Sequence, residues 1–424
     1  MSPNNLIVRS LNNLFKKYIT YKHKGRISYM SKPMLFTGIR PTGELHLGHY
    51  FSIIEPMVKR QKDHQIVIMI ADLHSLTSLR KACKNIMLHE VAHDISTYTD
   101  EIINVLSRFI KIDNENVIIF RQSDLREYHY DLFYKLMMIS RHSMTFGNPI
   151  FSEAMIIEYE REVDLLKLDI KMKDLIKQFI HWTPEILWGN ISERIGIDLK
   201  TFLIKKYNEL HRISIEEDKI DKIIRYLNTR IGVIGLASYP ILMAADIILH
   251  NPEYVIVGSD QIPHMQITND LVDLLNKYWD LLIRQPKGVI IHSKTVKGSD
   301  GRKMSKSYGN HLSINDLFDD DSGVFFNKIK TYSRKREDTG IPSRCLVGEY
   351  FNLFNLTNNC LDLCKVAQIG CVECKSILRK SIMEFISTTA IFKSSNHENL
   401  LIDGANIMKE RINNNTILRK LLLI

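Results

Sequence analysis

The chain has 424 residues, 45% hydrophobic and 25% charged, which is typical of a globular protein with two or three domains. No uncharged apolar run reaches about 18 residues, which excludes a membrane-spanning helix from the expected elements. Lysine and arginine outnumber aspartate and glutamate by 57 to 48. This excess suits a polyanionic partner, although a modest basic excess also simply keeps a protein soluble.

The N-terminal extension, residues 1–32, is basic and contains no acidic residue, since the first one in the chain is Glu44. Four of its apolar residues are spaced roughly as one helical face: Leu6, Leu11, Leu14 and Phe15. This pattern is typical of a transit peptide, so we expect the mitochondrial matrix or another organelle such as a plastid. The alternatives are a basic arm that helps to hold RNA in a cytoplasmic protein, and a true start at Met30.

Apolar segments alternate with helical patterns from residue 34 onward. The expected strands are residues 34–39, 65–73, 116–123 and 254–260. The expected helices are residues 46–62, a long segment ending near residue 110, and residues 239–250. This alternation predicts an α/β fold, a Rossmann-type doubly wound parallel sheet with ligands at the carboxyl ends of the strands.

Two regions depart from this alternation. Residues of about 156–228 are charged and helix-rich, and we interpret them as a helical insertion in an α/β domain that covers residues 33–311. Strand patterns fade after residue 311, so residues 312–424 are expected to form a separate α-helical domain.

The sequence "TGIRPTGELHLGHY", residues 37–50, places a histidine pair at the start of the first expected helix. A helix N-terminus offers free N–H groups to phosphate, and Gly48 leaves room for a nucleotide against the backbone. His46 and His49 share one helical face and can donate hydrogen bonds to phosphate oxygens. Two ordinary surface histidines are the alternative, but their position directly after the first strand favours a nucleotide site.

The sequence "GSDGRKMSKSYGN", residues 298–310, predicts a mobile loop that presents cations. Lys303 and Lys306 in such a loop suit the stabilisation of a leaving pyrophosphate. A basic surface loop is the alternative.

Five separate motifs together resemble the bacterial and organellar tryptophanyl-tRNA synthetases, which are class I aminoacyl-tRNA synthetases. "HLGH" and "KMSKS" are similar to the two signatures of that class. "IADLHSLT", "YPILMAADIIL" and "VGSDQIPHMQITNDL" narrow the resemblance to the tryptophanyl enzymes. The resemblance implies that the chain uses ATP and Mg²⁺ to attach L-tryptophan to tRNA(Trp) through tryptophanyl-AMP, releasing AMP and diphosphate. It also implies a homodimer, and an anticodon-binding role for the helical domain 312–424.

The resemblance assigns the ATP site to residues from both signatures and from the end of the fourth strand. Its catalytic members are His46, His49, Lys303 and Lys306. The ATP contacts are Arg40, Pro41, Thr42, Gly48, His49, Gly258, Ser259, Asp260, Lys303, Met304, Ser305, Lys306 and Ser307. Ser259 stands where the family commonly has an acidic residue, which puts that contact in doubt.

For tryptophan, we expect Asp246 to accept the indole N–H, since a buried indole without a partner is unfavourable. The resemblance implies apolar walls of Phe36, Met243, Val255 and Val257, with room for the ring at Gly38. Tyr239, His74 and Gln261 are the expected polar contacts of the ammonium and carboxylate groups. Plain core packing is the alternative for Met243 and the two valines.

Five of the six cysteines lie within thirty residues, and Cys364, Cys371 and Cys374 have the spacing C-x6-C-x2-C. With Cys345 they suit a tetrahedral zinc or an iron–sulfur cluster. "CKVAQIGCVECK" resembles the segment by which some tryptophanyl enzymes bind a [4Fe–4S] cluster, but Cys345 is closer to Cys364 than in that pattern. Cys360 is an alternative first ligand, and buried free cysteines are the alternative to a metal site.

Three rival functions remain open on the sequence. A tyrosyl-tRNA synthetase shares this architecture, and a phenol O–H is also a donor to Asp246. A non-catalytic tRNA-binding paralogue and a small-molecule adenylyltransferase are the other two, and the retained signatures and the helical domain argue against them.

Overall fold

The computed structural model describes residues 32–75, 88–145, 234–291, 296–318, 322–331, 335, 337–356, 359–390, 392 and 397–423, with a few isolated positions between 163 and 222. The N-terminal extension up to residue 31 and most of the predicted insertion 156–228 lie outside these residues. Every described strand and named helix lies in the compact unit Met34–Ile424. Among the described residues, no helix is long and apolar enough to cross a membrane.

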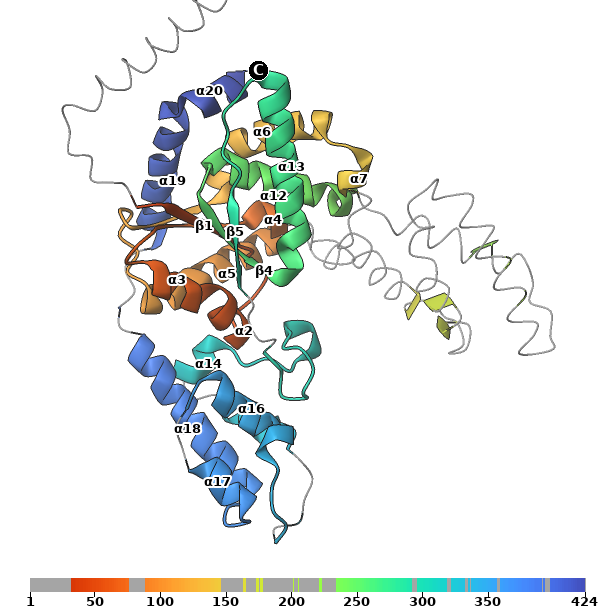
Figure 1. Cartoon of the computed structure of the whole chain (residues 1–424), viewed down its shortest axis with the longest axis vertical. Coiled ribbons are helices and arrows are strands. Elements are labelled where there is room, and N and C mark those ends of the chain that lie inside the picture. Colours follow the sequence, from red (N-terminus) through yellow and green to blue (C-terminus); the bar gives the residue numbers. More distant parts are fainter. Residues whose placement is uncertain are drawn as a thin grey trace, which may run out of the picture. The chain divides into compact units, whose positions relative to one another are not determined.

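A parallel sheet with the strand order β3-β2-β1-β4-β5 lies among the helices of this unit. Figure 1 labels three of its strands, β1, β4 and β5. Its strands are β1 (Met34–Ile39), β2 (Gln65–Ile70), β3 (Val117–Arg121), β4 (Tyr254–Gly258) and β5 (Lys287–Ile291). The strand order reverses between β1 and β4, which is the position where Rossmann-type folds bind ligands. The predicted α/β class is therefore confirmed.

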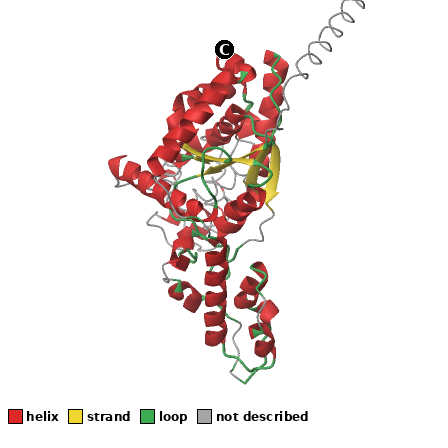
Figure 2. Cartoon of the chain, turned by 90° about the vertical axis from the view of Figure 1, so that its left-hand side faces the viewer, coloured by secondary structure: helices red, strands yellow, loops and turns green. Residues whose placement is uncertain are grey.

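The strand residues alternate between two apolar cores, one on each face of the sheet. In β2, Ile66 and Ile68 pack in the first core, while Val67 and Met69 pack in the second. This alternation follows from the two-residue period of a strand, and it explains why the strand sequences are apolar throughout. Figure 2 shows the helices (red) lying around the strands (yellow).

The helices of the α/β part fall into two groups along the chain. Before β4 they are α2 (Leu47–His49), the π-helical η1 (Tyr50–Ile54), α3 (Glu55–Arg60), α4 (Asp72–Ser75), α5 (Leu88–Phe109), the 3-10 segment η3 (Gln122–Leu125), α6 (Arg126–Ile139), α7 (His142–Thr145) and α12 (Ile234–His250). After β4 come η5 (Ser259–Gln261), α13 (Ile262–Trp279) and η6 (Lys306–Tyr308).

The predicted helix 46–62 is divided into α2, η1 and α3. Pro56 lies in the first turn of α3, where its missing N–H and fixed φ are tolerated. In the π-helical segment before it, Tyr50 and Ile54 are both buried in the first core. The sequence pattern predicts the helix but not this local change in its winding.

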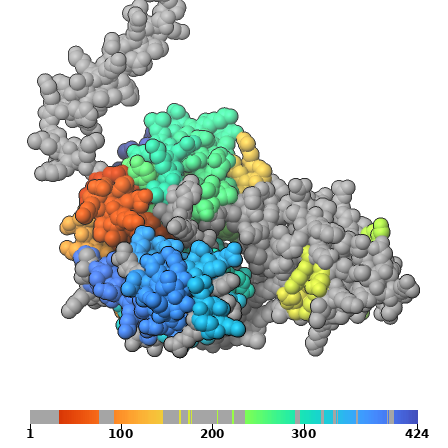
Figure 3. Space-filling view, turned by 60° about the horizontal axis from the view of Figure 1, so that its bottom comes forward, coloured from red at the N-terminus to blue at the C-terminus, as the bar shows by residue number. Residues whose placement is uncertain are grey.

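The C-terminal helices are α14 (Ile314–Phe318), α15 (Gly323–Lys328), η7 (Pro342–Arg344), α16 (Leu346–Leu353), α17 (Cys360–Lys365), α18 (Cys371–Thr389), α19 (His397–Asn414) and α20 (Thr416–Leu423). Helices α16, α17 and α18 pack together (Figure 1). They meet the α/β part through aromatic contacts, including the rings of Tyr50 and Phe385, whose centroids are 6.2 Å apart. Figure 3 shows the surface of residues near 50 (orange) beside that of residues near 380 (blue).

Helix α19 is part of the predicted helical domain 312–424, but in the structure it packs on β3 of the sheet. Met408 and Ile412 belong to the second core together with residues of β2 and α12. At Gly404 the helix is so close that a Cβ atom would lie 1.9 Å from the carbonyl oxygen of Ile119. Residues 397–423 therefore complete the α/β part, whereas the helical segment proper ends with α18.

Candidate active site

The histidines of the first signature cap the helix that follows β1. His46 has an extended backbone at the N-cap, and its Nδ1 accepts the backbone N–H of Gly48 at 3.1 Å. In return, Nδ1 of His49 accepts the backbone N–H of His46 at 3.1 Å. A neutral imidazole with an accepting Nδ1 carries its proton on Nε2. Both rings therefore keep an Nε2–H donor that the cap does not use.

Both histidines are neutral at physiological pH. Burial, followed by the charges of Lys306 and His311, lowers the pKa of His46 to about 4. Burial also lowers the pKa of His49 well below its ordinary value, and His46 and Lys306 lower it further. This pair can therefore donate hydrogen bonds to an anion, while its predicted contact with phosphate stays a prediction. Gly48 is required here, since a Cβ atom on it would lie 2.8 Å from Cε1 of His46.

The second signature forms a loop that is held together by the buried side chain of Asn310. Its Oδ1 accepts the backbone N–H of Ser305 at 2.8 Å, and its Nδ2 donates to Oδ1 of Asp300 at 2.7 Å. Asp300 in turn accepts from the guanidinium of Arg302. These bonds arrange the loop so that Met304 is buried and Lys303 is exposed. Mobility of this loop stays a prediction.

Lys306 of this loop lies beside the turn that precedes the histidines. Its Nζ is 2.8 Å from the position that a Cβ atom on Gly43 would occupy. Burial lowers the pKa of Lys306 to about 8, while the carboxylates of Glu44 and Glu101 act in the opposite direction. The two signatures, which are far apart in the sequence, thus meet in one site. Because the pKa of Lys306 is about 8, the charge of this lysine changes as the pH rises through that value.

The remaining predicted ATP residues lie at the carboxyl ends of β1 and β4, which are neighbours in the sheet. Arg40, Pro41 and Thr42 follow β1 directly, and Gly258 and Ser259 end β4 or follow it. Asp260 lies in η5, but its side chain and that of Ser307 lie outside the described side chains. The topology therefore brings both predicted groups to one edge of the sheet, although their contact with ATP stays a prediction.

Asp246 is buried at the same edge and is held by three side chains. Its Oδ1 accepts from Nε2 of Gln122 and from Nδ1 of His129, each at 2.7 Å. Its Oδ2 lies 2.7 Å from Nε2 of His74. Gln122 and His74 follow the carboxyl ends of β3 and β2, while His129 comes from α6.

The carboxylate of Asp246 is ionised. Burial alone would raise the pKa of Asp246, but the charge of His74 and the hydrogen bonds from His129 and His74 lower it to about 2. An ionised carboxylate only accepts hydrogen bonds, so the facing ring nitrogens of His74 and His129 donate. The predicted indole acceptor is therefore present as a buried anion.

The structure places the other predicted tryptophan residues around α12 and the central strands. Phe36, Val255 and Val257 are buried in the second core, and Met243 packs against it. Their contact with tryptophan stays a prediction. Gly38 is exposed, and the nearest atom to a Cβ on it is Cε of Met69 at 3.6 Å.

Two predicted polar contacts of the substrate have partners in the protein. His74 bonds to Asp246, and the hydroxyl of Tyr239 lies 2.8 Å from Nε2 of His264. Gln261 is half-buried in η5. The role of His74 thus includes holding Asp246, which the sequence reasoning did not assign to it.

Sequence reasoning missed Gln122, His129 and His250. His250 is buried beside His129, with ring centroids 5.3 Å apart. A signal for His129 was available, because it lies on the helical stripe of Leu125, Leu132 and Leu136, all of them buried. A histidine on the buried stripe of a helix predicts a polar partner in the core.

The cysteines do not form the predicted metal site in this structure. The sulfur of Cys374 is paired with that of Cys360, not with those of the other three predicted ligands. Cys345, Cys364 and Cys371 are half-buried and are not part of this pair. Within the described ranges, no group of three or more cysteine, histidine or carboxylate side chains is arranged to hold a metal ion. The arrangement seen here therefore does not fit a zinc ion or an iron–sulfur cluster.

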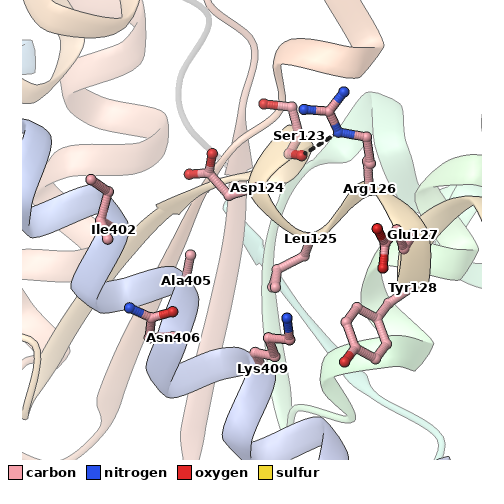
Figure 4. A pocket seen from close by; sticks show the side chains of 10 residues that line it. All are labelled: Ser123, Asp124, Leu125, Arg126, Glu127, Tyr128, Ile402, Ala405, Asn406 and Lys409. Carbon is pink, nitrogen blue, oxygen red and sulfur yellow. Dashed lines mark hydrogen bonds between the residues drawn. The ribbon is translucent and has the colours of Figure 1, made fainter.

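A separate cavity of about 520 Å³ lies between α19 and the first turn of α6 (Figure 4). Its lining mixes charges of both signs, with Arg126 and Lys409 facing the same space as Asp124 and Glu127. None of the predicted ATP or tryptophan residues lines it. This cavity therefore has a lining of its own, although part of that lining also follows the carboxyl end of β3.

Comparisons with known proteins agree with this site. The family model of the class I tRNA synthetases (W and Y) matches residues 30–145 and 198–383. A tryptophan–tRNA ligase of Aquifex aeolicus is 30% identical over 368 residues, covering 83% of this chain and 88% of the relative. One of Thermotoga maritima is 25% identical and covers 82% and 84%.

The fold is also shared with a solved structure, the tryptophanyl-tRNA synthetase of Campylobacter jejuni complexed with ADP and tryptophan. The two chains are 21% identical, each is covered to 92%, and the TM-score is 0.54. Together with the signature residues at the carboxyl edge of the sheet, the matches establish that this chain belongs to the class I tRNA synthetases of the tryptophan and tyrosine type.

Proposed function

We propose that this chain is a tryptophan–tRNA ligase, which activates L-tryptophan with ATP and transfers it to tRNA(Trp). The observation that carries the proposal is the ionised, buried carboxylate of Asp246, which lies at the same edge of the sheet as the two signatures. A buried anion that accepts hydrogen bonds suits the indole N–H, which can only donate. The names of the two relatives support tryptophan over tyrosine.

In the first step, the tryptophan carboxylate attacks the α-phosphorus of ATP, and pyrophosphate leaves. The Nε2–H groups of His46 and His49 and the ammonium group of Lys306 are donors for the negative charge that shifts to the phosphate oxygens. The family uses ATP with Mg²⁺, which offsets the charge of the phosphates. The protein contributes position and electrostatics, and none of these residues is needed as a nucleophile.

In the second step, a terminal ribose hydroxyl of the tRNA attacks the mixed anhydride, and AMP leaves. The net charge of +9 favours the approach of this polyanion. Helices α16–α18 are the proposed anticodon-binding segment.

ATP–pyrophosphate exchange with single amino acids tests the proposal. We expect exchange with tryptophan and none above background with tyrosine. Exchange with tyrosine alone would identify a tyrosyl enzyme, and a well-folded protein that exchanges with neither would fit a non-catalytic paralogue.

We also propose that the protein is a homodimer with α6 at its interface. Tyr130, Tyr134 and Met138 lie four residues apart on one face of α6 and are 44%, 65% and 64% exposed. An apolar helical stripe of this kind favours burial against a partner. Light scattering on the wild type and on Tyr134→Glu tests it. We expect a dimer that the charge dissociates, and a monomeric wild type would contradict the proposal.

An iron–sulfur cluster stays a proposal that rests on the C-x6-C-x2-C spacing. A cluster needs the thiolate of Cys374, whereas the pair with Cys360 consumes it, so the two states exclude each other. To distinguish the cluster from the cysteine pair, wild type and Cys360→Ser are purified anaerobically, and their iron content and visible absorbance are measured. Iron in both proteins would support the cluster, and an active, iron-free, colourless protein would contradict it.

An organellar location is proposed from the acid-free residues 1–32. Residues 1–32 fused to a fluorescent protein should direct it to mitochondria or plastids. A fusion that stays in the cytoplasm would contradict the proposal.

A further inference from the structure

We propose that His129 is a positioning residue that sets the selectivity of the site for an indole N–H. This inference rests on the proposed function, in which Asp246 accepts that N–H. It assigns a role to a histidine that lies outside both signatures, on helix α6.

The hydrogen-bond capacity of Asp246 shows what His129 does. A carboxylate has about four acceptor positions, two on each oxygen. On Oδ1, both are filled, by Gln122 and His129. On Oδ2, one is filled, by His74. The remaining position is therefore on Oδ2, and a substrate N–H is directed to this oxygen because Oδ1 is already saturated.

The surroundings of His129 fix its ring in this role. His129 is wholly buried, and His250 meets its ring edge-on, with an interplanar angle of 63°. His250 is itself enclosed by the rings of Phe36 and Phe120, at centroid distances of 5.3 and 5.1 Å. His250 and Asp246 are one helical turn apart on α12, so one helix carries both the carboxylate and the support for its donor.

Two polar atoms on the side chains that hold the carboxylate are left over, and both are acceptors. Oε1 of Gln122 and Nε2 of His129 are buried and have no hydrogen-bond partner among the described atoms. A phenol group both donates and accepts, whereas an indole N–H only donates. A site rich in unpaired acceptors therefore favours indole, and it penalises a ligand that brings no donor at all.

The loss of the His129 donor should weaken this selectivity. Without it, Oδ1 has an empty acceptor position, so the carboxylate is free to turn, and its ionised form loses a stabilising hydrogen bond. The loss in kcat/KM for a substrate without an N–H, compared with tryptophan, then becomes smaller. His129→Asn should preserve the selectivity, since its side-chain amide can place a donor near the position of Nδ1.

The test compares tryptophan with benzothienylalanine, in which sulfur replaces the indole N–H. The measured quantity is the ratio of kcat/KM for the two amino acids in ATP–pyrophosphate exchange. We expect a ratio of about tenfold or more in the wild type and in His129→Asn. In His129→Leu the ratio should fall towards one, mainly through a higher KM for tryptophan. His64→Leu is the control, since His64 precedes the amino end of β2 and packs on Tyr254, away from the site.

A structural role would lower both kcat/KM values equally and leave the ratio unchanged in His129→Leu, which would overturn the inference. His129→Phe, which retains a ring but no donor, replaces the leucine variant if that does not fold. If neither folds while His129→Asn does, His129 is needed for folding rather than for selectivity, and the inference is again overturned. A wild type that does not activate tryptophan contradicts the proposed function instead.

Discussion

Nζ of Lys306 lies 2.8 Å from the place where a Cβ atom of Gly43 would be, so the lysine loop rests on the turn before the histidine pair. Gly43 has a φ of 131°, a conformation that residues with a Cβ rarely adopt. The glycine therefore gives both the shape of the turn and the space for the ammonium group. This proximity brings the two signatures together.

The lowered pKa of Lys306 predicts the alkaline limb of activity. The ammonium group loses its charge as the pH rises through about 8, so kcat/KM for ATP should fall above that pH. Lys306→Arg keeps its charge and should remove the limb at a lower overall rate. Glu44→Gln should move the limb to lower pH, because Glu44 raises the pKa of the lysine. A flat wild-type profile up to pH 9.5 would contradict this account.

The cap at His46 allows catalysis to be separated from folding. In His46→Asn, the amide oxygen can still accept the N–H of Gly48, since asparagine is a favourable N-cap, but the Nε2–H donor is lost. We expect kcat of exchange to fall about 100-fold, while the midpoint of urea unfolding hardly changes. A variant that keeps the wild-type kcat would show that Nε2 does not act on the phosphates.

The close approach of α19 to β3 predicts a large effect of one methyl group. Gly404→Ala would place its Cβ against the carbonyl oxygen of Ile119, and backbone atoms cannot move aside cheaply. We expect a loss of about 2–3 kcal/mol in the free energy of unfolding, measured in urea. Gly323→Ala is the matched control, because its nearest contact is at 3.5 Å, and it should be neutral. Equal stability of the two variants would contradict the packing described here.

The sequence predicts the parts of the fold that local pattern determines. The first four strands follow from their apolar runs, and β1 has the bounds that the pattern predicts. Strand β5 is missed because it begins with the exposed residues Lys287 and Gly288, which interrupt the apolar pattern of a buried strand. Helix α19 is predicted as a helix but assigned to the wrong core, since a helical pattern does not say which surface the helix covers.

The same limit applies to the site. His46, Lys306 and Asp246 were found because each lies in a recognisable motif. Gln122 and His129 were not, because their importance depends on contacts with a residue more than a hundred positions away. Such long-range pairing is visible only once the strands are ordered and α6 is packed on α12.

An aminoacylation assay tests most directly whether this chain charges tRNA(Trp) with tryptophan. Labelled tryptophan and labelled tyrosine are each offered with ATP and with transcripts of tRNA(Trp) and tRNA(Tyr). We predict ATP-dependent attachment of tryptophan to tRNA(Trp), and a loss of this activity in Asp246→Ala. Attachment of tyrosine to tRNA(Tyr), or no attachment by a folded dimer, would contradict the account.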